Sequence, residues 1–243
     1  MIIHKIKYKL KRILQVLYVL PKPVIVETVD PKWQWLGKLG IKTILNIGSN
    51  EGQFALQLRK HIQRARIYAF EPLPKPLEQL SSNFANDLNF QAFPYALGEE
   101  EGVVKMYLNE YSPSSSLLKM DDNHKKHFEF AKNEFEVEVT IKKLDSVAKQ
   151  IEISRPLLIT IDVQGFEIDV IKGGLNTIRS ADIIITEVSY TRLYEHQPFF
   201  DDVYTLLISL GFAFVGNFEQ LISPISGAVL QADAIFMKKN LLT

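Results

Sequence analysis

The sequence predicts one α/β domain with a mostly parallel sheet covered by helices on both faces, and three observations support this. From residue 42 onward, short apolar, β-branched runs alternate with segments of helical spacing. The run at 43–47 ends at a glycine turn, and the run at 67–70 ends at Glu71 and Pro72. A chain of 243 residues, 47% hydrophobic and 23% charged, is long and apolar enough to bury one full core.

The first half of the chain is predicted to form three strands with two helices between them. The run Thr43-Ile44-Leu45-Asn46-Ile47 has the character of a buried parallel strand. Phe54, Leu58 and Ile62 recur at helical spacing. Prolines at 74 and 76 are tolerated in the first turn of a helix. The predicted elements are a strand at 43–47, a helix at 52–63, a strand at 67–70, a helix from Pro74 to Phe84 and a strand at 90–95.

Residues 103–142 interrupt this alternation, and we interpret them as an insertion or cover beside the sheet. Residues 103–108 follow a turn and predict an antiparallel strand, and 135–141 alternate apolar and polar residues, which predicts one wet face. The alternation then resumes. The later predicted elements are a strand at 157–161, a helix at 167–179, a strand at 183–186, a helix at 199–210 and two strands at 212–218 and 231–237.

Residues 1–40 are predicted to form a basic, helical N-terminal extension, and residues 41–243 the main domain. Residues 1–26 contain six lysines and arginines and no acid, and the apolar run 13–20 is far shorter than the ~20 residues of a membrane span. A helix packed on the domain and a helix lying on an anionic membrane both fit this pattern. We expect a cytoplasmic protein. Weak contact with the inner face of the membrane through residues 1–20 is the alternative that this pattern leaves open.

The charge balance excludes one class of partner. Lys and Arg number 28 and Asp and Glu number 28, so the basic surplus that nucleic-acid binding requires is absent. Cysteine is absent, which excludes disulfides, thiolate metal sites and a cysteine nucleophile. The composition leaves the oligomeric state open, and Trp33 and Trp35 can either stack on a sugar or serve as packing.

The ends of the strands carry the candidate site residues, because parallel sheets bind ligands there. Gly48 and Gly52 bound a turn after the first strand, in a spacing that fits neither G-x-G-x-x-G nor a P-loop. Glu71 follows about 20 residues later and can accept hydrogen bonds from ribose hydroxyls. The glycine turn and the acid together predict a site for a nucleoside-bearing cofactor.

Three further residues are candidates for proton transfer. Asp162 follows the strand at 157–161, Glu187 follows the strand at 183–186, and His196 lies in the next loop. An imidazole exchanges its proton near neutral pH, so His196 is the favoured base, with Asp162, Glu187 and Glu167 as alternatives. Asp162, Glu187 and His196 could also gather a divalent cation, although no spacing signature supports one and we predict no metal.

The chain resembles the FkbM-type methyltransferases, which depend on S-adenosylmethionine. The resemblance covers about residues 40–238, and the stretch Asp162-Val163-Gln164-Gly165-Phe166-Glu167 is its most specific part. The sequence departs from the family at Asn46, where methyltransferases often carry an acid, and at Gln164, where this family often has Glu. The other matching stretches are 44–52, 70–72, 96–98, 170–174 and 233–236.

This resemblance implies a Rossmann-like class I methyltransferase fold, with a seven-stranded sheet whose last strand, near 231–237, is antiparallel. It implies S-adenosylmethionine as cofactor and a hydroxyl of a sugar, polysaccharide or polyketide as methyl acceptor. Glu71 would hold the ribose, Ala96 and Leu97 would flank the adenine, and the loop 114–116 would close over the site. The implied cofactor residues are Asn46, Gly48, Ser49, Asn50, Gly52, Glu71, Pro72, Ala96, Leu97 and Asp162.

Two other functions remain as alternatives. An NAD-dependent oxidoreductase could use a similar sheet, but the absence of G-x-G-x-x-G is against it. A non-catalytic relative could bind a cofactor or a partner without transferring a group. The expected partners are therefore a small-molecule or glycan acceptor and no nucleic acid.

Overall fold

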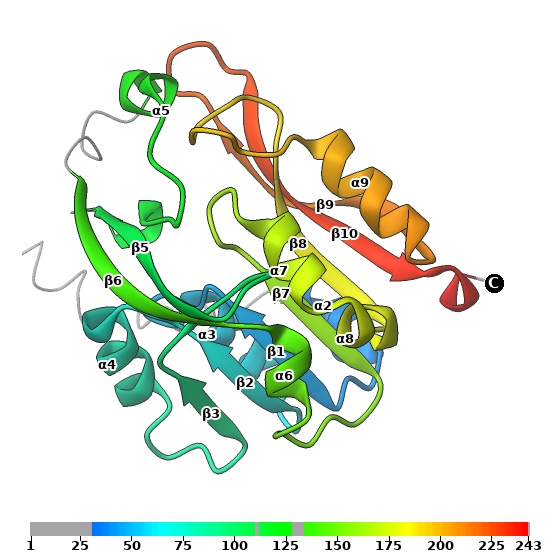
Figure 1. Ribbon diagram of the computed structural model, residues 1–243. Coiled ribbons are helices and arrows are strands. Elements are labelled where there is room, and N and C mark those ends of the chain that lie inside the picture. The colour runs from blue at the N-terminus through cyan, green and yellow to red at the C-terminus, as the bar shows by residue number, and fades with distance from the viewer. Residues whose placement is uncertain (1–30, 110–111, 128–133, 243) are drawn as a thin grey trace, which may run out of the picture. The chain divides into compact units, whose positions relative to one another are not determined.

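The computed structural model describes residues 31–109, 112–127 and 134–242, and its centre is a seven-stranded sheet (Figure 1). The strand order is β3-β2-β1-β7-β8-β10-β9, and β10 runs antiparallel to both of its neighbours. The predicted sheet with an antiparallel last strand is therefore confirmed. The strands are β1 (Thr43–Ile47), β2 (Arg66–Phe70), β3 (Phe90–Phe93), β7 (Leu157–Ile161), β8 (Ile183–Ser189), β9 (Phe212–Ile222) and β10 (Val229–Lys238).

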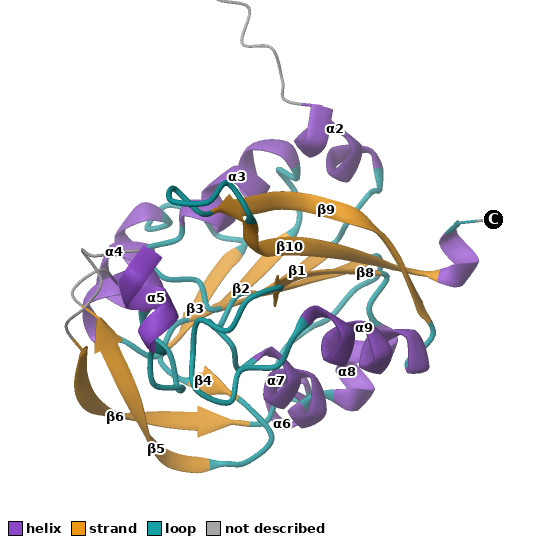
Figure 2. Ribbon diagram, turned by 90° about the horizontal axis from the view of Figure 1, so that it is seen from above, coloured by secondary structure: helices purple, strands orange, loops and turns teal. Residues whose placement is uncertain are grey.

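Helices cover both faces of this sheet (Figure 2). Every residue of β1 and β7 is buried, as expected for central parallel strands. Ile44 joins one core cluster with α2 and α3, whereas Leu45 and Ile47 join the other with α6 to α9. The helices are α2 (Pro31–Lys38), α3 (Gln53–His61), α4 (Pro74–Asn83), α6 (Leu144–Ala148), α7 (Glu167–Gly173), α8 (Leu175–Ser180) and α9 (Phe200–Ser209).

The helix predicted at 167–179 is two helices, α7 and α8, and glycines explain the break. A Cβ on Gly173 would lie 1.8 Å from the carbonyl oxygen of Gly98, and one on Gly174 would lie 2.6 Å from Leu144. Only glycine permits this close backbone packing, and glycine is also a weak helix former. The prediction of a single helix was wrong because it did not weigh this pair.

A second, three-stranded sheet of order β4-β6-β5 stands beside the main sheet (Figure 2). It consists of β4 (Ala96–Leu97), β5 (Gly102–Asn109) and β6 (Glu134–Lys142), with β5 and β6 antiparallel as predicted. Val139 and Ile141 are buried, and the polar residues at alternate positions, Glu136, Glu138 and Thr140, are exposed. The wet face predicted for 135–141 is confirmed. Short helices η1 (Ser112–Ser114), α5 (Asp122–His127) and η3 (Lys239–Leu241) complete the described chain.

Strands β8 and β10 change from apolar to polar residues along one of their two faces. On the face that packs with α2 and α3, Ile183 and Ile185 of β8 are core residues, and alternation puts Glu187 and Ser189 on the same face. The strand was predicted to stop at residue 186 because its last residues are not apolar. This polar extension forms one wall of the site described below.

Trp33 of α2 is a packing residue. Its ring contacts Phe54, His61 and Phe218, and only 6% of its surface is exposed. Trp35 packs against the same core cluster. The domain boundary predicted at residue 40 stays a prediction, and the proposed membrane contact of residues 1–20 lies outside the described residues. No helix within 31–109, 112–127 and 134–242 has the length and apolarity that a membrane crossing needs.

Candidate functional site

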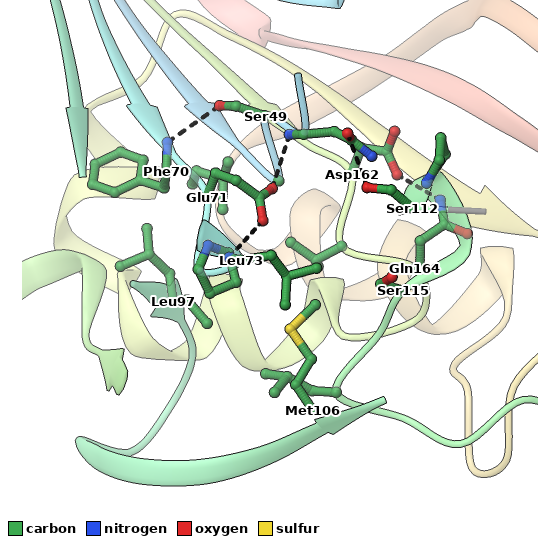
Figure 3. Close-up of a pocket in the computed structure, with 18 of the residues that line it drawn as sticks. Ser49, Phe70, Glu71, Leu73, Leu97, Met106, Ser112, Ser115, Asp162 and Gln164 are labelled. Carbon is green, nitrogen blue, oxygen red and sulfur yellow. Dashed lines mark hydrogen bonds between the residues drawn. The ribbon is translucent and has the colours of Figure 1, made fainter. Parts of the chain in front are cut away.

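A first cavity of about 520 Å³ lies at the carboxyl ends of the parallel strands (Figure 3). Four segments that each follow a strand contribute to it, as expected where a doubly wound sheet binds its ligand. The loop around η1 borders it as well, through Ser112, Pro113 and Ser115. The four strand-end segments are Gly48–Asn50, Glu71–Leu73, Tyr95–Leu97 and Asp162–Gln164.

The turn after β1 requires glycine. Gly48 has φ +78°, and a Cβ there would lie 1.8 Å from the carbonyl oxygen of Asp162. The backbone N–H groups of Gly48 and Ser49 both donate to the carbonyl of Phe70, at 3.1 and 3.0 Å. Because β1, β2 and β7 meet at this point, the turn fixes the floor of the first cavity.

Asn50 connects the glycine turn to the loop above it. Its Oδ1 accepts the N–H of Glu51 at 2.7 Å and the hydroxyl of Ser112 at 3.1 Å. Gly52 has φ +90° and precedes α3, but it does not line the first cavity. Asn46 lies beneath the turn, where its amide donates to Thr160 at 2.8 Å. Of the residues expected at the cofactor, Asn46 and Gly52 therefore support the cavity and do not face it.

Glu71 projects a carboxylate into the first cavity (Figure 3). Its Oε2 accepts the backbone N–H of Asn50 at 2.9 Å, and its Oε1 accepts that of Leu73 at 2.8 Å. These bonds fix the side chain and leave further lone pairs on each oxygen for a ligand. Burial raises the pKa of Glu71 to about 7, although both hydrogen bonds oppose that shift.

Apolar side chains form the opposite wall of the first cavity. Ala96 and Leu97, both buried, come from β4, and Met106 comes from β5 (Figure 3). Pro72 and Leu117 also line the cavity. The first cavity thus presents hydrogen-bond acceptors at Glu71 and an apolar wall beyond it.

A second cavity of about 450 Å³ adjoins the first over β8, β10 and β9. Asp162 and Gln164 line both cavities, as do Pro113 and Glu219. Glu187 and Asp233 are direct partners in the register of β8 and β10, so their side chains stand on the same face. Asp162 therefore stands at the junction of the two cavities.

Gln164 holds two of these carboxylates next to each other. Its Nε2 donates to Asp162 Oδ1 at 2.7 Å and to Glu187 Oε1 at 3.1 Å, and its Oε1 accepts the hydroxyl of Tyr194 at 2.9 Å. The backbone of Gln164 is left-handed, with φ +54°. The side-chain amide of Gln164 thus donates a hydrogen bond to each of the two carboxylates. An ionised glutamate at this position could not do so, because its side chain has no donor.

Crowding of acids controls the protonation of this junction. Burial raises the pKa of Asp162, even though its carboxylate opens onto the cavities. Burial, then Asp162 and Glu167, raise the pKa of Glu187 well above its ordinary value. Burial and Asp162 raise the pKa of Asp233 to about 7. Like charges disfavour each other's ionised form, so the pKa of each of these acids depends on the charge of its neighbours.

The structure does not bring the predicted bases together as a set. His196 is exposed, has φ +59° and lines neither the first nor the second cavity. Glu167 is buried, and its Oε1 accepts the N–H groups of Val163 and Gly165 at 3.2 and 3.0 Å. Glu167 thus stabilises the turn, and Asp162 and Glu187 remain at the junction. In the described part of the chain, no three such side chains are grouped as metal ligands.

The sequence did not single out several residues that line the cavities. Asp233 and Gln231 continue the face of Ile235 and Met237 on β10, as Glu187 continues that of Ile185 on β8. That change from apolar to polar at alternate positions of two strands was the available signal. Met106 and Ser112 had no comparable signal, because the second sheet brings them to the site from a distant part of the sequence.

The sheet order, the glycine turn and the acid after β2 define a class I methyltransferase fold. A family model for the methyltransferase FkbM domain matches residues 46–214. The chain belongs to the FkbM methyltransferase family.

Curated relatives are methyltransferases. The chain is 28% identical over 161 residues to the 2-O-methyltransferase NoeI of Sinorhizobium fredii, a match that covers 63% of this chain and 66% of NoeI. It is 27% identical over 147 residues to the hexuronic acid methyltransferase AglP of Haloferax volcanii, covering 59% and 54%. The matches thus span less than two thirds of either relative.

Among solved structures, the N-methyltransferase NodS of Bradyrhizobium japonicum has a similar fold. The TM-score is 0.50 at 11% sequence identity, and the alignment covers 85% of this chain and 90% of NodS. At this identity the similarity concerns the fold alone.

Proposed function

We propose that the protein is an S-adenosylmethionine-dependent methyltransferase that methylates a hydroxyl group of a sugar, a polysaccharide or a related natural product. The observation that carries this proposal is the pair of joined cavities. The first has a hydroxyl-binding acid and apolar walls, and the second is polar, with Asp162 between them. One ligand on each side would meet at that carboxylate.

The residues of the first cavity fit this cofactor. Glu71 would bind the ribose hydroxyls, Ala96 and Leu97 would flank the adenine, and the backbone of Gly48 to Asn50 would surround the methionine part. When bound, the cofactor supplies an electrophilic methyl group on a positively charged sulfur.

The charge of the lining favours a cationic cofactor over a dinucleotide. Glu71, Asp162 and Glu219 line the first cavity, and its described lining contains no lysine or arginine. A pyrophosphate would gain no charged partner there, whereas a sulfonium would be attracted. This observation joins the missing G-x-G-x-x-G in arguing against an NAD-dependent oxidoreductase.

Asp162 is the proposed general base. A hydroxyl is a weak nucleophile near neutral pH, so a base must accept its proton as the methyl group is transferred. Asp162 borders both cavities, and the raised pKa that burial gives it makes it a stronger base than an ordinary aspartate. Gln164 orients it through the 2.7 Å hydrogen bond. Glu187, whose pKa burial and the neighbouring acids also raise, is the second proton site of the pair.

The acceptor is proposed from the relatives and from the second cavity. NoeI is named a 2-O-methyltransferase and AglP a hexuronic acid methyltransferase, which supports a hydroxyl on a sugar. Serine, glutamine and carboxylate side chains line the second cavity and can bind several hydroxyls at once.

The direct test is transfer of a labelled methyl group from S-adenosylmethionine to a panel of oligosaccharides by the full chain. We expect labelled glycan and S-adenosylhomocysteine in equal amounts, with the label on an oxygen by mass spectrometry. Binding of the cofactor without any labelled product would support the non-catalytic alternative. Methylation of nitrogen or carbon alone would contradict the proposed hydroxyl acceptor.

A further inference from the structure

The ionisable residues that line the second cavity are mostly acids, more than the proposed reaction requires. Its described lining includes four carboxyl groups and one imidazole, and neither lysine nor arginine. Lys32 of α2 pairs with Glu219 at 2.6 Å and so offsets one of the four acids. The ionisable lining residues are His124, Asp162, Glu187, Glu219 and Asp233.

The remaining polar groups suit hydroxyls. Gln220 and Ser114 line the second cavity beside Gln164, and buried Gln231 lines it from β10. Glu187 Oε2 is buried and accepts no hydrogen bond from the residues that the structure describes. A buried acceptor of this kind is stabilised by a ligand that donates, such as a hydroxyl or an ammonium group.

We propose that the second cavity binds the methyl acceptor and selects a hydroxyl-rich sugar unit that carries no negative charge. This inference rests on the proposed function and deepens it by naming the charge of the acceptor. Neutral and amine-bearing sugars both satisfy the donor requirement of Glu187. A uronic acid or a phosphorylated sugar would place a further negative charge against Asp162, Glu187 and Asp233.

The charge argument has a measurable size. Unfavourable contacts between like charges cost several kcal/mol in desolvated sites. A tenfold loss of affinity corresponds to only about 1.4 kcal/mol, so such a contact is large enough to cause it. A uronic acid would bring its carboxylate against the acids of this lining, whereas a neutral sugar brings hydroxyls that both donate and accept hydrogen bonds. We therefore expect at least about tenfold discrimination against acidic sugars.

The test is binding of the full chain, saturated with S-adenosylhomocysteine, to a glycan array at pH 8. The array presents matched oligosaccharides of glucose, glucosamine and glucuronic acid. We expect retention on the glucose or glucosamine series at least about tenfold above the glucuronic acid series. Preference for glucuronic acid, or no retention on any series, would overturn the inference.

Two variants tie the selectivity to this cavity. Asp233→Asn and Glu219→Gln each remove one acid, and Glu219→Gln, at a side chain that is 52% exposed, also removes the ion pair with Lys32. Each should reduce the discrimination at least about threefold. Asp201→Asn, an exposed acid of α9 outside the cavities, is the matched control and should leave the ratio unchanged.

Calorimetry separates this inference from the proposed function. If the chain binds S-adenosylhomocysteine but the variants keep the wild-type glycan ratio, the charge inference is wrong and the proposed cofactor site stands. If the chain does not bind S-adenosylhomocysteine, the proposed function fails and the inference fails with it.

Discussion

The two cavities are built from different parts of the chain. Main-chain groups shape the first: the Gly48 turn hydrogen bonds to Phe70, and both oxygens of Glu71 accept backbone N–H groups. Side chains shape the second, where Glu187 Oε2 has no hydrogen-bond partner among the described residues. We therefore expect that few residues of the first cavity can be substituted without loss of the fold. Side chains of the second cavity should be replaceable with a change in ligand selectivity and no loss of the fold.

The largest expected effect falls at the junction of the cavities. Asp162→Asn keeps the shape but removes the proposed base, and kcat should fall by about 10²–10⁴. The affinity for S-adenosylhomocysteine should change little, because Glu71 and the glycine turn remain. Steady-state kinetics and calorimetry measure the two effects. If Asp162→Asn kept wild-type kcat, the proton would have to go elsewhere, with Glu187 the next residue to test.

The second effect tests whether backbone geometry fixes the first cavity. Gly48→Ala combines φ +78° with a Cβ only 1.8 Å from the Asp162 carbonyl oxygen, so it should cost about 3 kcal/mol or more of unfolding free energy. Gly40→Ala has a similar φ of +63° with no atom within 4 Å of the added Cβ, and should cost only about 1 kcal/mol. Urea unfolding measures both. Equal costs would show that the turn does not depend on this close approach.

The smallest effect concerns acids in the second cavity. Burial raises the pKa of Asp233 to about 7, against about 4 for an unfolded aspartate. The stabilisation from this proton is complete below about pH 4 and is lost as the pH rises through about 7. Between pH 5 and pH 8, Asp233→Asn should therefore lose less stability than the wild type, by about 2–3 kcal/mol.

Urea unfolding of the wild type, Asp233→Asn and Asp201→Asn at several pH values checks this difference. The exposed Asp201 should not alter the pH profile. Parallel profiles for all three proteins would mean that Asp233 titrates as an ordinary aspartate in the folded chain.

The sequence predicted the central sheet because its middle strands, β1 and β7, are buried at every residue. The run Leu157-Leu158-Ile159-Thr160-Ile161 has one threonine among aliphatic residues, so its boundaries are clear. Where a strand is polar at its end, as in β8, the predicted boundary was too short. The break at Gly173 was missed because it depends on contact with Gly98, which is 75 residues earlier in the chain.

The site was predicted where residues follow strands and missed where tertiary structure brings them in. Gly48, Ser49, Asn50 and Glu71 line the first cavity because the end of a parallel strand always faces that edge of the sheet. His196 was favoured for its chemistry, but a loop position does not fix a direction, and its side chain is exposed. The roles assigned to these residues remain predictions.

The central claim is that Glu71 and the glycine turn bind the nucleoside of S-adenosylmethionine. Calorimetry with S-adenosylhomocysteine tests it most directly, on the wild type, Glu71→Ala and the exposed control Glu78→Gln. We predict one site in the wild type and in Glu78→Gln, and at least about tenfold weaker binding in Glu71→Ala, which corresponds to about 1.4 kcal/mol. No binding by the wild type at millimolar ligand, or equal affinity in a folded Glu71→Ala, would contradict the claim.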